Sequence, residues 1–270
     1  MPDATHSVNF DHPPVVETSL KLQFTPLVEF RLAHFGLFME QCLGAGWQVG
    51  EDAAAEPQEY ERFGVKSLLP TGKPPTDFPP YQARFIQAGG GRVVSFQPNK
   101  LQLSWVRQEG QEPRYVEMRE QLTRMFESLR AFAGRYSLGN PVANLWEISY
   151  INAIPAGELW TTPADWRKVL PGLFPTEGPQ VPGHLWGTYT GEWYLEMPHQ
   201  LGRVRARAQK VISNPSETTA LLLVVSARGE LSDEAGENWA ARLDLGHDSA
   251  TIAFRSLASP VALSHWGLRA

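Results

Sequence analysis

Arginine stands at every second position of the segment RVRARAQK, at Arg203, Arg205 and Arg207. Because successive side chains of a β-strand point to opposite faces, a strand here aligns the three guanidinium groups in one cationic row. Such a row suits a site for an anion or for single-stranded nucleic acid. It equally suits a solvent-facing row that a neighbouring strand neutralises.

The segment GEWYLEM, just before the arginine row, favours the neutralised row. It alternates in the same way, and the short connection PHQLG predicts an antiparallel hairpin between the two strands. The expected register gives two ion pairs and a cation–aromatic contact: Glu196 opposite Arg203, Tyr194 opposite Arg205, and Glu192 opposite Arg207. We therefore expect at least one of these carboxylates to lie within ion-pair distance of an arginine.

The segment LDLGHD carries the residue types of a metal site. On a helix, Asp244, His247 and Asp248 sit at i, i+3 and i+4, and imidazole with carboxylates suits zinc, iron or manganese. His247 also lies on the apolar side of this helix, with Leu243 and Phe254. A buried histidine that is hydrogen-bonded to a backbone carbonyl or to Asp244 would account for its position without a metal. The remaining histidines show no ligand spacing, so we favour a buried structural histidine without a metal.

Other enzyme signatures are missing from the sequence. Gly44, Gly46 and Gly50 close a predicted helix, whereas a dinucleotide fingerprint needs glycines that open one. The phosphate-loop, His-Glu-x-x-His and Gly-x-Ser-x-Gly motifs do not occur, and Cys42 fits a small helix residue. We expect no catalytic residue and no cofactor.

Two proline-rich segments, 51–80 and 171–186, are longer than most connections inside a domain, and the first half of 51–80 is acidic. Proline restricts the unbound chain, so less entropy is lost when a partner orders such a segment. Tryptophan and tyrosine are also favoured at protein interfaces. We expect these segments to bind a partner through five aromatic anchors: Phe63, Phe78, Tyr81, Trp160 and Trp186. The alternative is that they only cover the edge of the sheet against aggregation.

The order of predicted elements occurs twice along the chain. Alternation predicts an opening strand at 16–24, with Lys21 and Gln23 on its polar, solvent-facing side. Apolar spacing predicts helices at 28–43, with Leu32 on the packed side, and at 114–136, with a strand meander between them. The second half repeats this order of strand, helix, proline-rich loop, strands and long helix. Its first helix is expected to begin with Thr162 as N-cap, Pro163 at the first position and a capping box to Asp165. The sequence therefore predicts one α+β domain over 1–270, with halves of about 14–138 and 142–258 and a short C-terminal helical tail. These halves would share an antiparallel sheet with helices packed on one face.

Composition limits the possible partners. The chain has 270 residues, a net charge of −5 and an isoelectric point near 5.8, which disfavours duplex nucleic acid and anionic membranes. One cysteine suits a reducing compartment. No secretory signal or apolar run of about 18 residues is present, so we expect a cytoplasmic protein that binds no membrane.

Several segments, among them DHPPVVETSLKLQFTPL, VVSFQPNKLQLSW, ISYINAI and LDLGHDSATIAFRSLASPVALSHWG, resemble a sporadically distributed family of uncharacterised bacterial proteins. That family shares a Pro-Pro-(Ile/Val)-Val-Glu opening strand, an Arg-Tyr-(Ile/Leu)-Asn central strand and a Leu-Asp-x-x-His helix. Here Ser149 stands where the family often has the arginine. The resemblance implies no activity, and the family's patchy occurrence is similar to that of mobile or host-defence genes.

These observations favour a noncatalytic interaction or regulatory protein of a bacterial system, associated with defence or with a toxin–antitoxin pair, and with a protein as its partner. Two alternatives stay open. One is a small-ligand or nucleotide-binding module that uses the groove between the halves. The other is a metal-dependent hydrolase centred on His247.

Overall fold

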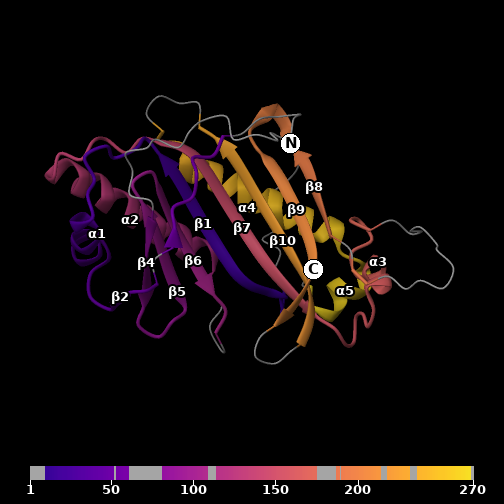
Figure 1. The fold of residues 1–270 in the computed structure, drawn as a ribbon. Helices are drawn as coiled ribbons and strands as arrows, with labels where there is room; N and C mark the ends of the chain where they lie inside the picture. Colours follow the sequence, from indigo (N-terminus) through magenta and orange to yellow (C-terminus); the bar gives the residue numbers. More distant parts are fainter. Residues whose placement is uncertain are drawn as a thin grey trace.

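The computed structural model describes most of the chain: residues 10–51, 53–60, 81–108, 114–174, 187–188, 190–213, 218–231 and 236–268. Its centre is a strongly curved sheet, all of whose strand pairs are antiparallel (Figure 1). In order across the sheet the strands are β2 (Trp47–Val49), β4 (Tyr81–Gln87), β5 (Arg92–Gln97), β6 (Lys100–Val106), β1 (Val15–Phe24), β7 (Ala143–Pro155), β10 (Thr218–Glu230), β9 (Arg203–Ser213) and β8 (Thr190–Glu196). The short strand β3 (Ala53–Ala54) also pairs with β4.

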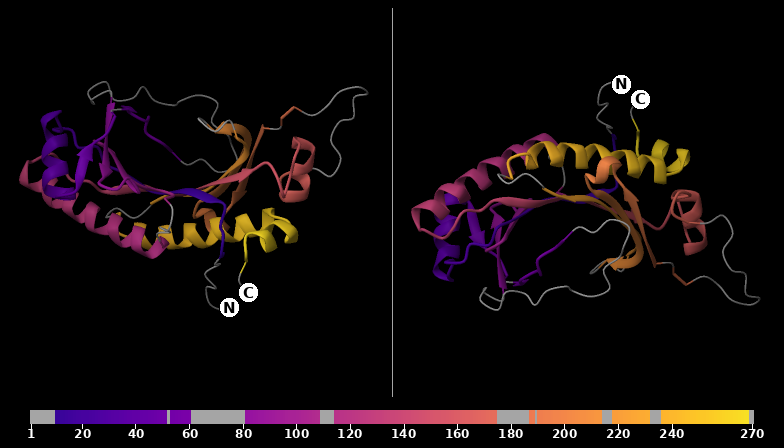
Figure 2. Two further views of the ribbon diagram at one scale, coloured as in Figure 1. Left: turned by 90° about the horizontal axis from the view of Figure 1, so that it is seen from below. Right: turned by 90° about the horizontal axis from the view of Figure 1, so that it is seen from above.

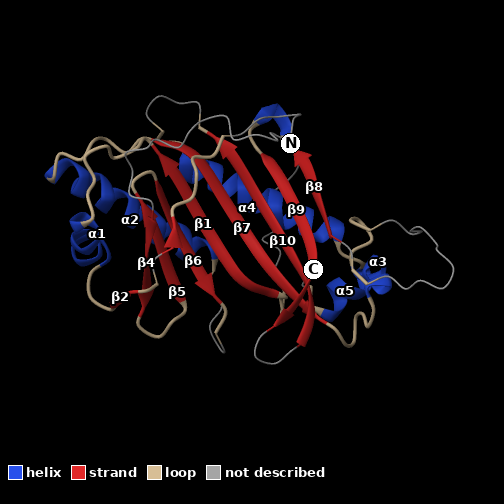
Figure 3. Cartoon of the chain, viewed as in Figure 1, coloured by secondary structure: helices blue, strands red, loops and turns tan. Residues whose placement is uncertain are grey.

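Two long helices, α2 (Tyr115–Arg135) and α4 (Trp239–Leu257), cover one face of this sheet, and the ends of the sheet bend away from them (Figure 2). Shorter helical elements lie toward the two ends of the sheet (Figure 3). They are α1 (Ala33–Phe38), the π-helical turn η1 (Met39–Leu43), the 3₁₀ turns η2 (Pro163–Asp165) and η3 (Pro198–Gln200), α3 (Trp166–Val169) and α5 (Pro260–His265).

The strand order confirms the predicted α+β fold of two similar halves. The first half runs outward from the centre as β1, β6, β5 and β4, and the second half runs outward as β7, β10, β9 and β8. In each half, therefore, the opening strand is central and the last strand before the long helix lies beside it. The two opening strands pair with each other, so one continuous sheet joins the halves.

The core lies between the sheet and the two long helices. Alternation in β1 buries Leu20 and Leu22, and the apolar stripe of α2 packs onto the same face of the sheet. Gly246 brings α4 close to β7, because a Cβ at this position would lie 2.4 Å from the ring of Trp146, which is fully buried. The opposite face of the sheet is not covered by these two helices (Figure 2).

The helix predicted over 28–43 is shorter than expected. Residues 28–32 form turns, the regular helix begins at Ala33, and Leu32, expected on the packed side, is 63% exposed. By contrast, the predicted start of the second half's first helix is confirmed, since Thr162 and Asp165 form a capping box around Pro163. None of the helices within the described residues is long and apolar enough to cross a membrane.

Candidate functional site on the polar face of the sheet

The sheet face turned away from α2 and α4, here called the polar face, carries charged side chains in register. Each residue of one row is paired with the next across neighbouring strands: Gln102, Lys21, Glu147, Arg228, Arg203 and Glu196. Side chains in such a row lie about 4.5–5.5 Å apart at Cβ, so opposite charges make contact across the strands. The bending of the sheet makes this face concave (Figure 2).

The next row on the polar face is made of small residues. Ser104, Ser19, Ser149 and Ser226 occupy paired positions on β6, β1, β7 and β10. The row then continues into Arg205 of β9, which lies opposite Ser226. Small side chains beside long charged ones leave space above the sheet where the serines meet the arginines.

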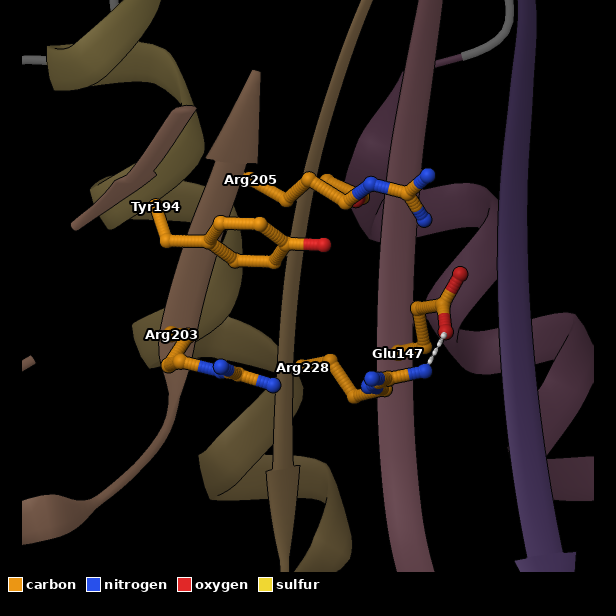
Figure 4. Close-up of a pocket in the computed structure, with 6 residues that line it drawn as sticks. Glu147, Tyr194, Arg203, Arg205 and Arg228 are labelled. Carbon is orange, nitrogen blue, oxygen red and sulfur yellow. Dashed lines mark ion pairs between the residues drawn. The ribbon is translucent and has the colours of Figure 1, made fainter. Parts of the chain in front are cut away.

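A hollow opens at this point, here called the arginine hollow. Its volume is about 270 Å³, including the solvent at its mouth, and its lining residues are Glu147, Tyr194, Arg203, Arg205, Ser226 and Arg228. Figure 4 shows the ring of Tyr194 between the side chains of Arg203 and Arg205. Three guanidinium groups from β9 and β10 therefore border one solvent-accessible depression.

The hairpin of β8 and β9 has the predicted register, and its ion pairing is diagonal. Glu192 lies opposite Arg207 in the ladder, yet its carboxylate pairs with Arg205 and accepts a hydrogen bond from the Tyr194 hydroxyl at 2.8 Å. Likewise, the cation–aromatic contact of Tyr194 is made with Arg203 and not with Arg205 as predicted: the Arg203 guanidinium lies 4.8 Å from the centroid of the Tyr194 ring. The twist of neighbouring strands brings such diagonal residues within reach of long side chains.

The arginines of the hollow differ from the predicted row in one member. Arg207 is exposed and donates to Gln209, whereas Arg228, which the sequence did not single out, lines the hollow. Arg205 pairs with Glu192 through Nη2 and keeps one further donor. Its Nε is buried without a hydrogen-bond acceptor among the described residues, and its side chain is still 40% exposed.

Beside the hollow, the segment of residues 56–59, here called the acidic segment, lies on the polar face. Glu59 forms ion pairs with Lys21 at 3.1 Å and with Arg228 at 3.2 Å, and Glu56 forms one with Lys100 at 3.1 Å. Lys21 also contacts Glu147 of β7 at 3.2 Å. This network joins the acidic segment to the arginine hollow through shared charges.

Burial and charge act in opposite directions on this network. Burial lowers the pKa of Lys21, but the carboxylates of Glu147, Glu59 and Glu56 outweigh it and raise that pKa above its usual value. For Glu59, burial raises the pKa, and Lys21, Lys100 and Arg228 together hold it below the usual value. Both groups are therefore charged at neutral pH.

The sequence placed Lys21 and Gln23 on a solvent-facing side of their strand, and this expectation was wrong. They are only 7% and 2% exposed, because the acidic segment covers them. The acidic composition of the first part of the 51–80 segment was the available signal. It did not reveal which lysine each carboxylate would meet.

His247, a residue of α4, lies in a polar cluster between that helix and the other face of the sheet. Its Nδ1 is 2.6 Å from the Tyr150 hydroxyl, and the ring of Tyr115 stacks on its imidazole at 4.1 Å. Asp244, one of the expected partners of His247, instead accepts a hydrogen bond from Tyr115. Burial lowers the pKa of His247, while Asp248 and Asp244 partly offset that effect.

This cluster contains too few ligands for the metal site considered from the sequence. Among the described residues, no group of three or more His, Cys, Asp or Glu side chains is arranged to hold a metal ion. Cys42 is half-buried, and burial raises the pKa of its thiol to about 11, which disfavours a reactive thiolate.

Of the five aromatic anchors predicted for a partner, Trp160 has a described side chain. Trp160 is only 3% exposed, packs against Trp166, and donates from Nε1 to the carbonyl of Ile154 at 3.0 Å. It is therefore a core residue, and the prediction for it was wrong. Phe63, Phe78, Trp186 and the side chain of Tyr81 lie outside the described residues, as do most of the two proline-rich segments.

No protein-family model matches the chain, and no curated protein shows significant similarity to it. The candidate site is therefore argued from its own residues.

Proposed function

We propose that this chain is a noncatalytic interaction protein, and that its arginine hollow receives an acidic side chain of a protein partner. The observation that supports this best is the position of Arg205. Its Nε is buried without an acceptor among the described residues, at the edge of a hollow that two further arginines border. Buried donors of this kind are normally satisfied, and a carboxylate matches the planar donor fork of a guanidinium group.

The size of the hollow favours a partner's side chain over a small molecule. Pockets that enclose a cofactor or a drug-sized ligand usually measure about 300–1,000 Å³ and bury most of the ligand. The arginine hollow is about 270 Å³ even with its open mouth included. A nucleotide would remain largely uncovered there, whereas the carboxylate group of a partner's side chain needs only guanidinium donors at the open mouth of the hollow.

We further propose that the protein works in the cytoplasm of a bacterium as a regulator. The low cysteine content and the resemblance to a patchily distributed bacterial family support this setting. In such a role the polar face would recognise the partner, and the long helices would support the sheet from behind.

The test is the recovery of a partner by variants of the hollow. R203Q/R205Q removes two charges from the polar face, and R130Q, on α2 behind the sheet, is the matched control. Tagged proteins are expressed in the native host, and the co-purifying proteins are quantified by mass spectrometry. We expect the amount of one specific co-purifying protein to be at least about tenfold lower with the double variant than with the wild type or R130Q. Equal recovery by all three folded proteins would show that the hollow does not bind the partner.

The same hollow offers a direct comparison with the small-ligand alternative. Inorganic phosphate and ATP are titrated into the wild type and into R203Q/R205Q by calorimetry. Under the proposed function, neither compound binds with an affinity that the arginine substitutions weaken. Binding of ATP that R203Q/R205Q weakens would instead identify the arginine hollow as a nucleotide site.

A further inference from the structure

The acidic segment is held on the polar face by two glutamines that each bind the backbone of a single residue. Gln23 accepts the Glu59 N–H at 2.7 Å and donates to the Glu59 carbonyl at 2.9 Å. Gln97 makes the same pair with Glu56, both bonds being 3.0 Å. Such paired bonds bind the main chain of an extended peptide whatever its side chains are.

Two lysines beside these glutamines select for acidic side chains. Lys100 donates to Glu56 at 3.1 Å and to the Pro57 carbonyl at 2.6 Å, and Lys21 donates to both carboxylate oxygens of Glu59. The four side chains thus form a groove, here called the lysine–glutamine groove: Lys21, Gln23, Gln97 and Lys100. It fits an extended peptide with two glutamates three residues apart.

The acidic segment shields the polar groups of the groove from water, so that Lys100 and Gln97 are each 3% exposed beneath it. Any occupant must pair with these groups, because a buried ammonium or amide left unpaired has a large desolvation cost. The occupant itself is less enclosed, since Pro57 is exposed and Tyr60 is 55% exposed. The segment is therefore held chiefly through contacts that another acidic peptide can reproduce.

We propose that the lysine–glutamine groove binds an extended acidic segment of a partner protein, and that the chain's own acidic segment occupies the groove until the partner's segment displaces it. This inference rests on the proposed function in one respect, namely that a protein partner binds the polar face. Glu59 pairs with Arg228, which also lines the arginine hollow. Displacement of the acidic segment therefore also removes one of the carboxylates that pair with Arg228, which keeps its ion pair with Glu147.

Competition within the chain gives the expected size of the effect. A tethered segment acts at an effective concentration of the order of millimolar, and a ligand's apparent affinity falls by the fraction of grooves that are unoccupied. In E56Q/E59Q the chain's own segment loses its ion pairs with both lysines. This variant should bind an acidic peptide at least about tenfold more tightly than the wild type.

The probe is a fluorescein-labelled peptide that copies residues 54–60, Ala-Ala-Glu-Pro-Gln-Glu-Tyr, and binding is followed by fluorescence anisotropy. E51Q, at an exposed position shortly before the segment, is the matched control and should bind like the wild type. A peptide with both glutamates replaced by glutamine should not bind. Adding K100M to E56Q/E59Q should abolish the gain, because Met fills the space of Lys100 without its charge.

A second measurement needs no variant. Saturating unlabelled peptide added to the wild-type chain should speed hydrogen exchange at the amides of Glu56 and Glu59, which the glutamines otherwise protect. Unchanged exchange, together with equal peptide binding by the wild type and E56Q/E59Q, overturns the inference and leaves the acidic segment as a fixed part of the fold. The proposed function is tested separately, by the recovery of a partner with R203Q/R205Q.

Discussion

The side chain of Gln23 and the backbone of Glu59 form a reciprocal pair of hydrogen bonds across 36 residues of sequence. Gln23 lies on a central strand of the sheet, and Glu59 lies in a segment without regular structure. Together with the matching pair between Gln97 and Glu56, these bonds set the position of an irregular segment.

Replacement of Gln23 should loosen the acidic segment. Q23L removes both hydrogen bonds to Glu59 and the bond to Asn144, and it leaves buried polar groups without partners. We expect the free energy of unfolding to fall by about 1–3 kcal/mol, measured by urea denaturation. Q48L, at an exposed position of β2, should change it little. Equal stability of the two variants would show that the segment is anchored elsewhere.

The ion pairs of Glu59 should make stability depend on acid. Its pKa in the folded protein lies below the model-peptide value of 4.5, so the unfolded chain takes up the proton first as the pH falls. The stabilisation is therefore complete well above pH 4.5 and decreases as the pH falls through and below that value. The stability difference between the wild type and E59Q, measured in urea, should shrink from pH 6 to pH 3.5. A constant difference across this range would contradict the assignment.

His247 should titrate below the usual range. Burial lowers its pKa from 6.5, so the unfolded state binds the proton more readily as the pH falls. The fold is therefore unaffected well above pH 6.5 and loses stability as the pH falls below that value. Chemical shifts of the imidazole protons give the pKa directly, and Y150F should alter it by removing the hydroxyl that lies 2.6 Å from Nδ1. A His247 pKa above 6.5 would contradict the burial argument.

Close packing of α4 on β7 should make Gly246 intolerant of a side chain. Alanine normally stabilises a helix by about 1 kcal/mol relative to glycine, but here its Cβ would overlap the buried ring of Trp146. We expect G246A to lower the free energy of unfolding by about 1–3 kcal/mol. G134A, in α2, has open space around it and should be neutral or stabilising, so the two substitutions should have opposite signs in thermal denaturation.

The predicted aromatic anchors show why some sites could not be read from the sequence. Trp160 has the residue type expected at an interface, but the same aromatic surface is favoured in a core, and only its packing against Trp166 separates the two cases. His247 was expected near Asp244 because both are on one helix, yet Tyr150 reaches it from the sheet. Local spacing identifies neighbours on one element and does not identify partners on another.

The sequence by itself determined the two similar halves, the inward face of β1, the stripe of α2 and the register of the β8–β9 hairpin, because periodicity, capping and tight connections are local properties. The tertiary structure alone decided that Arg228 joins Arg203 and Arg205 and that Lys21 and Lys100 are buried. These contacts depend on strand order and on a segment that crosses the sheet. The carboxylate that covers Lys21 comes from a residue 38 positions away, and the sequence records such a charge without recording which partner it will meet.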